Sequence, residues 1–368
     1  MNLSPMLEAL LSLCEEFEAS DLHLSVGQAP RFRIHGALVA KGDFRPFDVK
    51  AVDAIVMELG LFTLPVGSPD GTEKVRLTLL KDGAIDGALS SPSGARYRFN
   101  LYRDNGQHAV ALRRLDSSFR SFAELGLPQR VADFCNEPDG LVIVTGPTGS
   151  GKSTTLATML DRINHTRDGH ILTIEDPIEF VHKADRCLVN QRQVGRDTRS
   201  FNDALVEAMR QDPDVILVGE MRDLATVRTA LRAAETGHLV FATLHAGDCA
   251  GAIERLTSVF PAEEQTSARH QLALVLRGIF AQHLLMSPAG KRHPACELLV
   301  NTPACANLIA TARTAQIYSI IETGGKVGMQ TLDQSLAELL AKGLVDERTA
   351  VALSKNPDIL MGRRMQLC

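Results

Sequence analysis

The middle of the chain reads Gly146-Pro147-Thr148-Gly149-Ser150-Gly151-Lys152-Ser153-Thr154, and this stretch decides the fold that the sequence predicts. It matches the pattern G-x-x-x-x-G-K-[ST] of the phosphate-binding P-loop without a gap. An apolar run at 141–144 precedes it and is typical of a buried parallel strand, whereas residues 155–160 have the composition of a helix. In that order, the glycines let backbone N–H groups close around phosphate oxygens, and the helix N-terminus adds partial positive charge. The sequence therefore predicts that the whole stretch binds nucleotide, with Lys152 reaching the β- and γ-phosphates and the Ser153 hydroxyl as a ligand of Mg²⁺.

Length and composition limit the class of protein. A chain of 368 residues is too long for one ordinary hydrophobic core, so two domains are expected. The net charge of -5 provides no global basic field, which argues against nucleic acid as a partner and against a nucleic-acid motor. The N-terminus lacks the basic start of a signal peptide, and no apolar run reaches the length of about 18 residues that spans a membrane.

The cysteines indicate a reducing compartment. The 7 cysteines are scattered, and no C-x-x-C pair occurs, so neither a zinc site nor a disulfide framework is expected. Reduced thiols are typical of a cytoplasmic protein. Cys135 and Cys249 are interpreted as small core residues rather than as nucleophiles.

Residues 1–115 are predicted to form a small α+β domain. Apolar residues recur at helical spacing over 4–18. Alternation of apolar and polar residues, typical of half-buried strands in an antiparallel sheet, follows at 21–26, 31–35, 95–101 and 108–113. The stretch 67–94 is rich in Gly, Ser and Asp and is expected to be mostly loop.

Residues 116–124 are expected to be a linker, and residues 125–368 a second domain that ends in a helical region from about residue 300. Continuous apolar strands are predicted at 141–145, 171–174, 215–218 and 239–244, with helices between them. This order is typical of an α/β fold with a doubly wound parallel sheet. Ligands of such sheets bind beyond the carboxyl ends of the strands.

Two acids, Glu175 and Asp176, follow the predicted strand 171–174. Adjacent strand residues point to opposite faces, so both side chains reach one nucleotide only if the chain turns there, which Pro177 permits. Glu175 is a candidate catalytic residue and Asp176 a candidate nucleotide-binding residue. The alternative is an acidic exit from the strand into a loop.

A third acid, Glu220, follows the apolar strand 215–218, as in a Walker B arrangement. The position before it, often an Asp that helps to hold Mg²⁺ in P-loop enzymes, is Gly219. Magnesium would therefore rely on Ser153, water and either Glu175 or Asp176. Glu220 is the candidate for polarising the attacking water, or else a structural partner of Arg222.

Two histidines, His238 and His245, flank the strand 239–244. Seven residues of strand span roughly 23 Å, so the two side chains cannot share a metal. One of them could sense the γ-phosphate while the other packs elsewhere. For each, a structural histidine at a strand end is the alternative.

Together these segments resemble the secretion ATPase superfamily and, within it, the PilT-like motor ATPases of type IV pili. The likeness runs from Asp21 to about residue 345. Residues 170–182 look like the Asp box of that family, and residues 234–245 look like its His box. Further matching segments are 190–192, 210–214, 219–223 and 328–333.

The resemblance implies a cytoplasmic homohexameric ring that hydrolyses ATP with Mg²⁺, peripheral to the inner membrane. It also implies a PAS-like N-terminal domain and a RecA-like ATPase domain, with ATP at subunit boundaries. In this family basic residues of the N-terminal domain complete the ATP site, and Arg96, Arg98 and Arg113 occupy the matching stretches. A guanidinium supplied by another rigid body would stabilise the transferring phosphoryl and couple chemistry to motion. Alternatively, the three arginines line the solvent face of a half-exposed sheet.

Two features bear on the branch of the superfamily. The chain starts near the PAS-like domain and has no four-cysteine insertion between 285 and 297, which resembles the pilus retraction branch. However, residues 304–311 read Ala-Cys-Ala-Asn-Leu-Ile-Ala-Thr, whereas retraction motors carry A-I-R-N-L-I-R-E there. An accessory PilU-like motor and a nucleotide-gated assembly factor therefore remain alternatives. The implied partners are an inner-membrane platform protein and, for an accessory motor, a second retraction ATPase.

Overall fold

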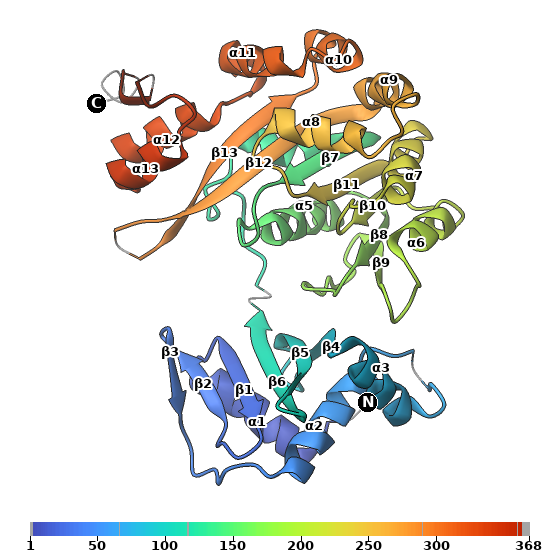
Figure 1. Ribbon diagram of the computed structural model, residues 1–368. Helices are drawn as coiled ribbons and strands as arrows, with labels where there is room; N and C mark the ends of the chain where they lie inside the picture. Colours follow the sequence, from blue (N-terminus) through green and yellow to red (C-terminus); the bar gives the residue numbers. More distant parts are fainter. Residues whose placement is uncertain (1–2, 66, 116–117, 289, 359, 363–368) are drawn as a thin grey trace. The chain divides into compact units, whose positions relative to one another are not determined.

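The computed structural model describes residues 3–65, 67–115, 118–288, 290–358 and 360–362 (Figure 1). Of the predicted linker, Asp116 and Ser117 lie outside the described residues. The chain forms two compact units. The first unit comprises Met1–Ser118 together with Glu175–Val181 and Gln191–Ser200, and the second comprises Phe119–Ile174, His182–Asn190 and Phe201–Cys368.

The first unit contains a six-stranded sheet in the order β3-β2-β1-β6-β5-β4. All its neighbouring strands are antiparallel, which confirms the predicted sheet. The elements are α1 (Pro5–Glu16), β1 (Asp21–Ser25), β2 (Arg31–Ile34), β3 (Ala37–Ala40), α2 (Val49–Leu61), α3 (Gly71–Asp82), β4 (Ala84–Ser90), β5 (Arg96–Asp104) and β6 (Gln107–Leu115).

Helix α1 shows how the sequence builds this core. Ser4 caps the helix by accepting a hydrogen bond from the Leu7 N–H, and Pro5 occupies the first turn, where its missing N–H costs nothing. The buried stripe of α1 consists of Leu7, Leu10, Leu11 and Cys14. It packs in one cluster with the inward residues of the strands, which are Leu22, Leu24, Phe99, Leu101, Val110 and Leu112.

The expectation that 67–94 is mostly loop is wrong. The stretch contains helix α3 and strand β4. Val75 and Leu79 lie four residues apart on α3 and are both buried, and Gly83 ends the helix in the left-handed conformation. Because the stretch is rich in Gly, Ser and Asp, its composition indicated loop although Val75 and Leu79 have helical spacing.

On the polar face of the sheet, cross-strand pairing places Arg33, Asp21, Arg113 and Arg98 in one row. Asp21 accepts a hydrogen bond from Arg113 Nε at 2.8 Å and lies 3.6 Å from Arg33 Nε. Burial alone would raise the pKa of Asp21, but the hydrogen bonds from Arg113 and Ser20 and the Arg113 charge lower it below its ordinary value. Asp21 therefore acts as an anionic link between β1 and β6.

The second unit contains a seven-stranded sheet in the order β13-β12-β7-β11-β10-β8-β9. Strands β12 (Leu276–Met286), β7 (Gly140–Thr145), β11 (Leu239–Leu244), β10 (Val215–Val218) and β8 (Gly169–Glu175) pair in parallel, which confirms the four predicted strands. The sequence pattern did not indicate β12 or the edge strands β13 (Arg292–Val300) and β9 (Cys187–Gln193). Because β13 runs antiparallel to β12, the sheet is mixed rather than purely parallel.

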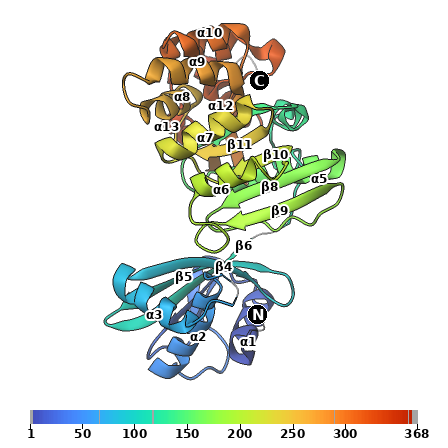
Figure 2. The ribbon, with the colours of Figure 1, turned by 90° about the vertical axis from the view of Figure 1, so that its right-hand side faces the viewer.

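Helices cover both faces of this sheet (Figure 2). Since strand–helix–strand crossovers are right-handed, the helix that leaves β7 covers the face opposite to the helices that leave β10 and β11. The helices are α4 (Gln129–Asp133), α5 (Lys152–Thr166), α6 (Phe201–Ala208), α7 (Leu224–Glu235), α8 (Cys249–Ser258), α9 (Gln265–Val275), α10 (Pro303–Ala310), α11 (Ile317–Thr323), α12 (Leu332–Ala341) and α13 (Glu347–Leu353). In the described part of the chain, none of the helices has both the length and the apolar character needed to cross a membrane.

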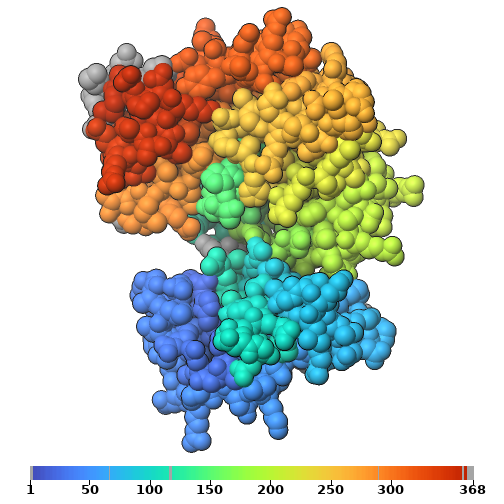
Figure 3. All heavy atoms as spheres, in the orientation of Figure 1, coloured from blue at the N-terminus to red at the C-terminus, as the bar shows by residue number. Residues whose placement is uncertain are grey.

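The last helices form a separate small core beside the β12–β13 hairpin. Leu336 and Leu340 of α12 pack in one cluster with Ala295 of β13 and Ala350 of α13. Figure 3 shows the red surface of these helices next to the orange surface of the hairpin.

Cys135 and Cys249 are buried, as expected, and burial raises the pKa of the Cys135 thiol to about 12.

Asp21→Asn should lower the free energy of unfolding of the first unit by about 1–3 kcal/mol at pH 7, because hydrogen bonds to a charged partner are lost. The folded pKa of Asp21 lies below its unfolded value, so this stability is present above about pH 4 and is lost as the pH falls through the folded pKa. Amide exchange in β1 and β6 should therefore differ between variant and wild type at pH 7 and converge in acid. Asp43→Asn, at an exposed position, is the control, and equal effects of the two substitutions at pH 7 would contradict this account.

Candidate nucleotide-binding site

The P-loop connects the end of β7 to the start of α5, as the sequence predicts. Gly146, Gly149 and Gly151 all have positive φ angles, of 145°, 78° and 92°. A Cβ at Gly146 would lie 2.2 Å from the Gln282 carbonyl oxygen, and one at Gly151 would lie 2.8 Å from Gln282 Nε2. Only glycine therefore satisfies both the backbone conformation and the close approach of β12.

Gln282 is a site residue that the sequence analysis missed. It is 4% exposed, and its Oε1 accepts a hydrogen bond from Thr155 Oγ1 on α5 at 2.7 Å. The side chain thus joins β12 to the first turn of the P-loop helix. A polar residue directly after the apolar run Ile279–Ala281 was the signal that could have revealed it.

The polar atoms of the loop suit an anion. Lys152 Nζ turns back over the loop and donates to the carbonyl oxygens of Gly146 and Pro147 at 2.9 and 3.0 Å. Ser150 Oγ is buried and, among the described residues, has no hydrogen-bond partner. Buried hydroxyls are normally paired, so this one has unused hydrogen-bonding capacity within the P-loop.

Magnesium also fits the donors present. The Ser153 hydroxyl is exposed at the start of α5, and Thr154 beside it is half-buried. Mg²⁺ takes oxygen ligands, keeps several waters and often binds through few protein groups plus substrate phosphates. One hydroxyl and the phosphate oxygens form a donor set of that kind.

Glu220 lies just beyond β10, and its contacts match both of the roles considered for it. Its Oε1 lies 2.6 Å from Arg222 Nε and 3.5 Å from His245 Nε2. Burial alone would raise the pKa of Glu220, but Arg222, His245 and Lys152 lower it below its ordinary value. The carboxylate is therefore ionised at neutral pH and can orient a polar group at this edge of the sheet.

His245 lies just beyond β11. Burial and the nearby Lys152 charge lower its pKa, so its imidazole is neutral at pH 7. A neutral ring can donate one hydrogen bond and accept another. The carboxyl ends of β7, β10 and β11 thus bring together Lys152, Glu220 and His245.

The structure does not bring His238 to the P-loop. Its neighbour Leu239 pairs with Gly140, the first residue of β7, whereas the P-loop follows the last residue of that strand. His238 Nδ1 lies 3.0 Å from the Ala233 carbonyl oxygen, at the C-terminal end of α7. The length of β11 therefore separates the two histidines, as its residue count predicts.

The remaining predicted site residues belong to the first unit. Glu175 Oε1 accepts a hydrogen bond from Gln191 Nε2 at 3.2 Å, and Asp176 is exposed. Arg96 is 8% exposed and donates through Nε and Nη2 to the Ile178 carbonyl oxygen at 3.2 and 2.9 Å. The alternative that Arg96 lines a solvent face is therefore wrong, because a carbonyl group of the loop 175–181 covers it.

The other two arginines are more accessible. The Arg98 side chain is 43% exposed and lies 3.8 Å from Asp86 and 3.9 Å from Glu179, which is loose pairing. The Arg113 side chain is 71% exposed, and its Nε bonds to Asp21. A solvent-facing position is accurate for these two residues.

Comparison with known proteins extends this description. Residues 100–344 match the model of a family described as type II/IV secretion system protein. The type IV pilus retraction ATPase PilT of Pseudomonas aeruginosa is 45% identical over 349 residues, which cover 95% of this chain and 98% of that protein. The type IV pilus ATPase PilU of the same organism is 36% identical, with 94% of this chain and 87% of that protein covered. A crystal structure of the pilus retraction motor PilT with bound ADP has a TM-score of 0.83 at 40% identity and covers 98% of this chain and 100% of that one.

A parallel strand, a P-loop and a helix within an α/β sheet define the class of P-loop proteins. More particularly, the chain belongs to the type II/IV secretion system protein family. The similarity to PilT covers nearly the whole chain, and the predicted fold class and the predicted resemblance are confirmed.

Gln282→Leu should lower the free energy of unfolding by about 1–3 kcal/mol, because the buried Thr155 hydroxyl loses its acceptor. Thr155→Val should have a similar effect, and the double variant should lose less than the sum, because both single changes break one interaction. Both single variants should also bind a fluorescent ADP analogue more weakly than wild type. Gln129→Leu, at an exposed position of α4, is the control, and full additivity would contradict the proposed link.

Proposed function

We propose that this chain is a hexameric motor ATPase that hydrolyses ATP to power type IV pilus retraction. The observation that carries the proposal is the meeting of Lys152, Glu220 and His245 beside a P-loop whose buried Ser150 hydroxyl has no partner among the described residues. The 45% identity to PilT of Pseudomonas aeruginosa supports the retraction role. The ADP in a PilT structure of the same fold supports the nucleotide.

Each proposed role follows from the chemistry of the residue. The backbone of Gly146–Thr154 and the Lys152 ammonium group bind and orient the phosphates. When bound with ATP, Mg²⁺ neutralises charge on the phosphates, and the Ser153 hydroxyl is the group that would hold it. Glu220 orients and polarises the attacking water, and the neutral His245 is placed to sense the γ-phosphate.

The proposed sites lie at subunit boundaries of a homohexamer. There Arg98 and Arg113 act as the residues that stabilise charge on the transferring phosphoryl, with Arg96 as a further contact to nucleotide. Glu175, the last residue of β8, is proposed to assist in catalysis, and Asp176, directly after it, in nucleotide binding. Their place on the exit of a strand of the same sheet supports this assignment.

We further propose that the ring works in the cytoplasm against the inner membrane, docked on the membrane platform protein of the pilus. A retraction motor has to act where pilin subunits leave the fibre. Net charge of -5 supports a protein partner rather than nucleic acid.

A second candidate function is that of an accessory, PilU-like retraction motor. The observation that favours it is the surface of α10 and α11, where a groove of about 590 Å³ is lined by Ala304, Asn307, Leu308, Gln316, Ser319 and Ile320, with no charged side chain among them. Such a surface packs against a partner but provides no charge to steer one. The lower identity to PilU, 36% against 45% to PilT, favours the principal motor.

Glu220→Gln should reduce kcat for ATP by roughly 10²-fold or more while ATP affinity stays within a few-fold, because the amide keeps the shape but polarises water poorly. Lys152→Ala should instead lose both nucleotide affinity and hydrolysis. Steady-state phosphate release with Mg²⁺, together with binding of a fluorescent ATP analogue, separates these outcomes, with Glu263→Gln as a surface control.

A wild-type protein that binds ATP without turnover would indicate the nucleotide-gated assembly factor. Loss of affinity with kcat retained in Glu220→Gln would assign Glu220 to structure or to Mg²⁺.

In a piliated cell that has this chain as its sole retraction ATPase, we expect twitching motility and ordinary amounts of surface pilin. Motility at the colony edge and sheared surface pilin are the measurements. Immobile, hyperpiliated cells that contain an ATPase-active protein would contradict the principal role and favour the accessory one. Restoring arginine at positions 306 and 310 together should then increase motility without changing phosphate release.

A further inference from the structure

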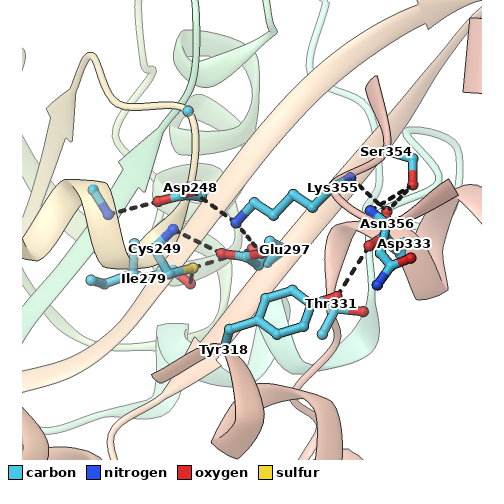
Figure 4. A network of polar contacts seen from close by, with 12 residues as sticks. Asp248, Cys249, Ile279, Glu297, Tyr318, Thr331, Asp333, Ser354, Lys355 and Asn356 are labelled. Carbon is cyan, nitrogen blue, oxygen red and sulfur yellow. Dashed lines mark hydrogen bonds and ion pairs between the residues drawn. The ribbon is translucent and has the colours of Figure 1, made fainter. Parts of the chain in front are cut away.

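Lys355, near the C-terminal end of the chain, lies between two carboxylates of the second unit (Figure 4). Its Nζ is 2.8 Å from Asp248 Oδ2 and 3.2 Å from Glu297 Oε2. Glu297, on β13, is 2% exposed. A buried carboxylate is costly unless it is paired, so the ammonium group has a specific electrostatic task here.

The backbone of this C-terminal segment is fixed independently of the lysine side chain. Ser354 Oγ and the Lys355 N–H donate to Asp333 Oδ1 at 2.7 and 3.1 Å. Tyr318 OH donates to the other oxygen of Asp333 at 3.0 Å. Asp333 is 1% exposed and lies in the first turn of α12, so the last helices hold Lys355 in place.

The acidic partners of Lys355 lead to the start of α8. Asp248 caps that helix by accepting from the Gly251 N–H at 2.6 Å. Glu297 Oε1 accepts from the Cys249 N–H at 2.9 Å while its Oε2 faces Lys355. One ammonium group thus joins two carboxylates that both hold the N-terminus of α8.

The short loop Ala246–Asp248 continues from this helix start to the candidate site. It follows His245 directly in the chain. The Ala246 carbonyl oxygen accepts from Thr145 Oγ1 at 2.9 Å, and the Gly247 carbonyl oxygen lies 3.0 Å from His283 Nε2. Since Thr145 is the last residue before the P-loop, the loop Ala246–Asp248 contacts the strand that leads into the P-loop and also the neighbouring strand β12.

We propose that Lys355 is a positioning residue for the nucleotide site, which fixes the loop Ala246–Asp248 and through it His245 and the entry to the P-loop. The inference rests on the proposed ATPase function. Without the ammonium group, the charges of Asp248 and Glu297 are balanced only by backbone N–H groups at the start of α8, and two like charges beside one helix end repel. The loop then relaxes away from β13, and the His245 ring moves with it.

The charge state of the lysine supports this role. Burial alone would lower the pKa of Lys355, but Glu297 and Asp248 raise it above its ordinary value. The group is thus cationic throughout the neutral range. A tight ion pair between the end of the chain and the loop after β11 makes the last helices part of the site rather than a detached appendage.

Lys355→Met in the full-length chain should lower kcat for ATP roughly 10- to 100-fold, the scale of a small misplacement of reacting groups, while affinity for a fluorescent ADP analogue stays within a few-fold. Lys355→Arg should recover most of the activity, because a guanidinium can pair with both carboxylates. Steady-state phosphate release with Mg²⁺ and analogue titration are the measurements.

Two controls separate positioning from simple clamping of the last helices. Tyr318→Phe removes one hydrogen bond to Asp333 but keeps both the aromatic ring, whose centroid lies 5.4 Å from Lys355 Nζ, and the two carboxylate partners of Lys355. We expect it to lower thermal stability while kcat stays within two-fold, and Lys342→Met, at the exposed C-cap of α12, to change neither. Unchanged kcat in Lys355→Met alongside a loss of stability like that of Tyr318→Phe would overturn the proposal, as would failure of Lys355→Arg to recover activity.

Amide exchange, which needs no ATP turnover, tests the positioning role of Lys355 separately from the proposed ATPase function. If the wild-type protein hydrolyses no ATP, the proposed function fails. Amide exchange over residues 245–251 still decides the role of Lys355. Faster exchange there in Lys355→Met, but not in Tyr318→Phe, supports the positioning role, and equal exchange in both variants and wild type overturns it.

Discussion

Much of the second unit depends on the close approach between the P-loop and strand β12. Positions 146 and 151 have no room for a Cβ, because the backbone and side chain of Gln282 occupy that space. The Gln282 side chain then ties the same strand to α5 through Thr155. A loop clamped in this way keeps its backbone conformation without relying on a ligand, so the backbone itself need not be ordered when a ligand binds. The glycines therefore serve packing within the protein as well as access for phosphate.

The same edge of the sheet joins elements that are distant in sequence. Thr145 ends β7, whereas Glu220 and His245 follow the ends of β10 and β11, and parallel pairing in register aligns these strand ends. Loop 246–248 extends this alignment to α8, and Lys355 extends it to the last helices. The C-terminal segment, which the sequence predicts only as a helical region, thus contacts Asp248, three residues after His245 in the chain.

The sequence alone predicted what depends on local pattern. The P-loop, the four apolar strands and the antiparallel N-terminal sheet follow from periodicity and from one specific motif. Helix α3 was missed because two apolar residues, Val75 and Leu79, carried the signal in a stretch rich in turn-forming residues. Gln282 and Lys355 were missed for another reason: their roles arise from contacts with residues 127 and 107 positions away, which no spacing rule encodes. Strand β13 is antiparallel, a direction that hydrophobicity does not report.

The internal hydrogen bonds of Arg96 affect how readily this side chain could bind an anion. Its guanidinium already donates two hydrogen bonds to the Ile178 carbonyl oxygen, and bonds from a charged donor are each worth about 1.5–3 kcal/mol. A nucleotide that binds Arg96 would therefore have to compete with this internal acceptor. If the arginine left this carbonyl group, the loop 175–181 would keep the looser contact between Glu179 and Arg98 of β5. Binding of an anion by Arg96 and loosening of the loop 175–181 would then be coupled through one side chain.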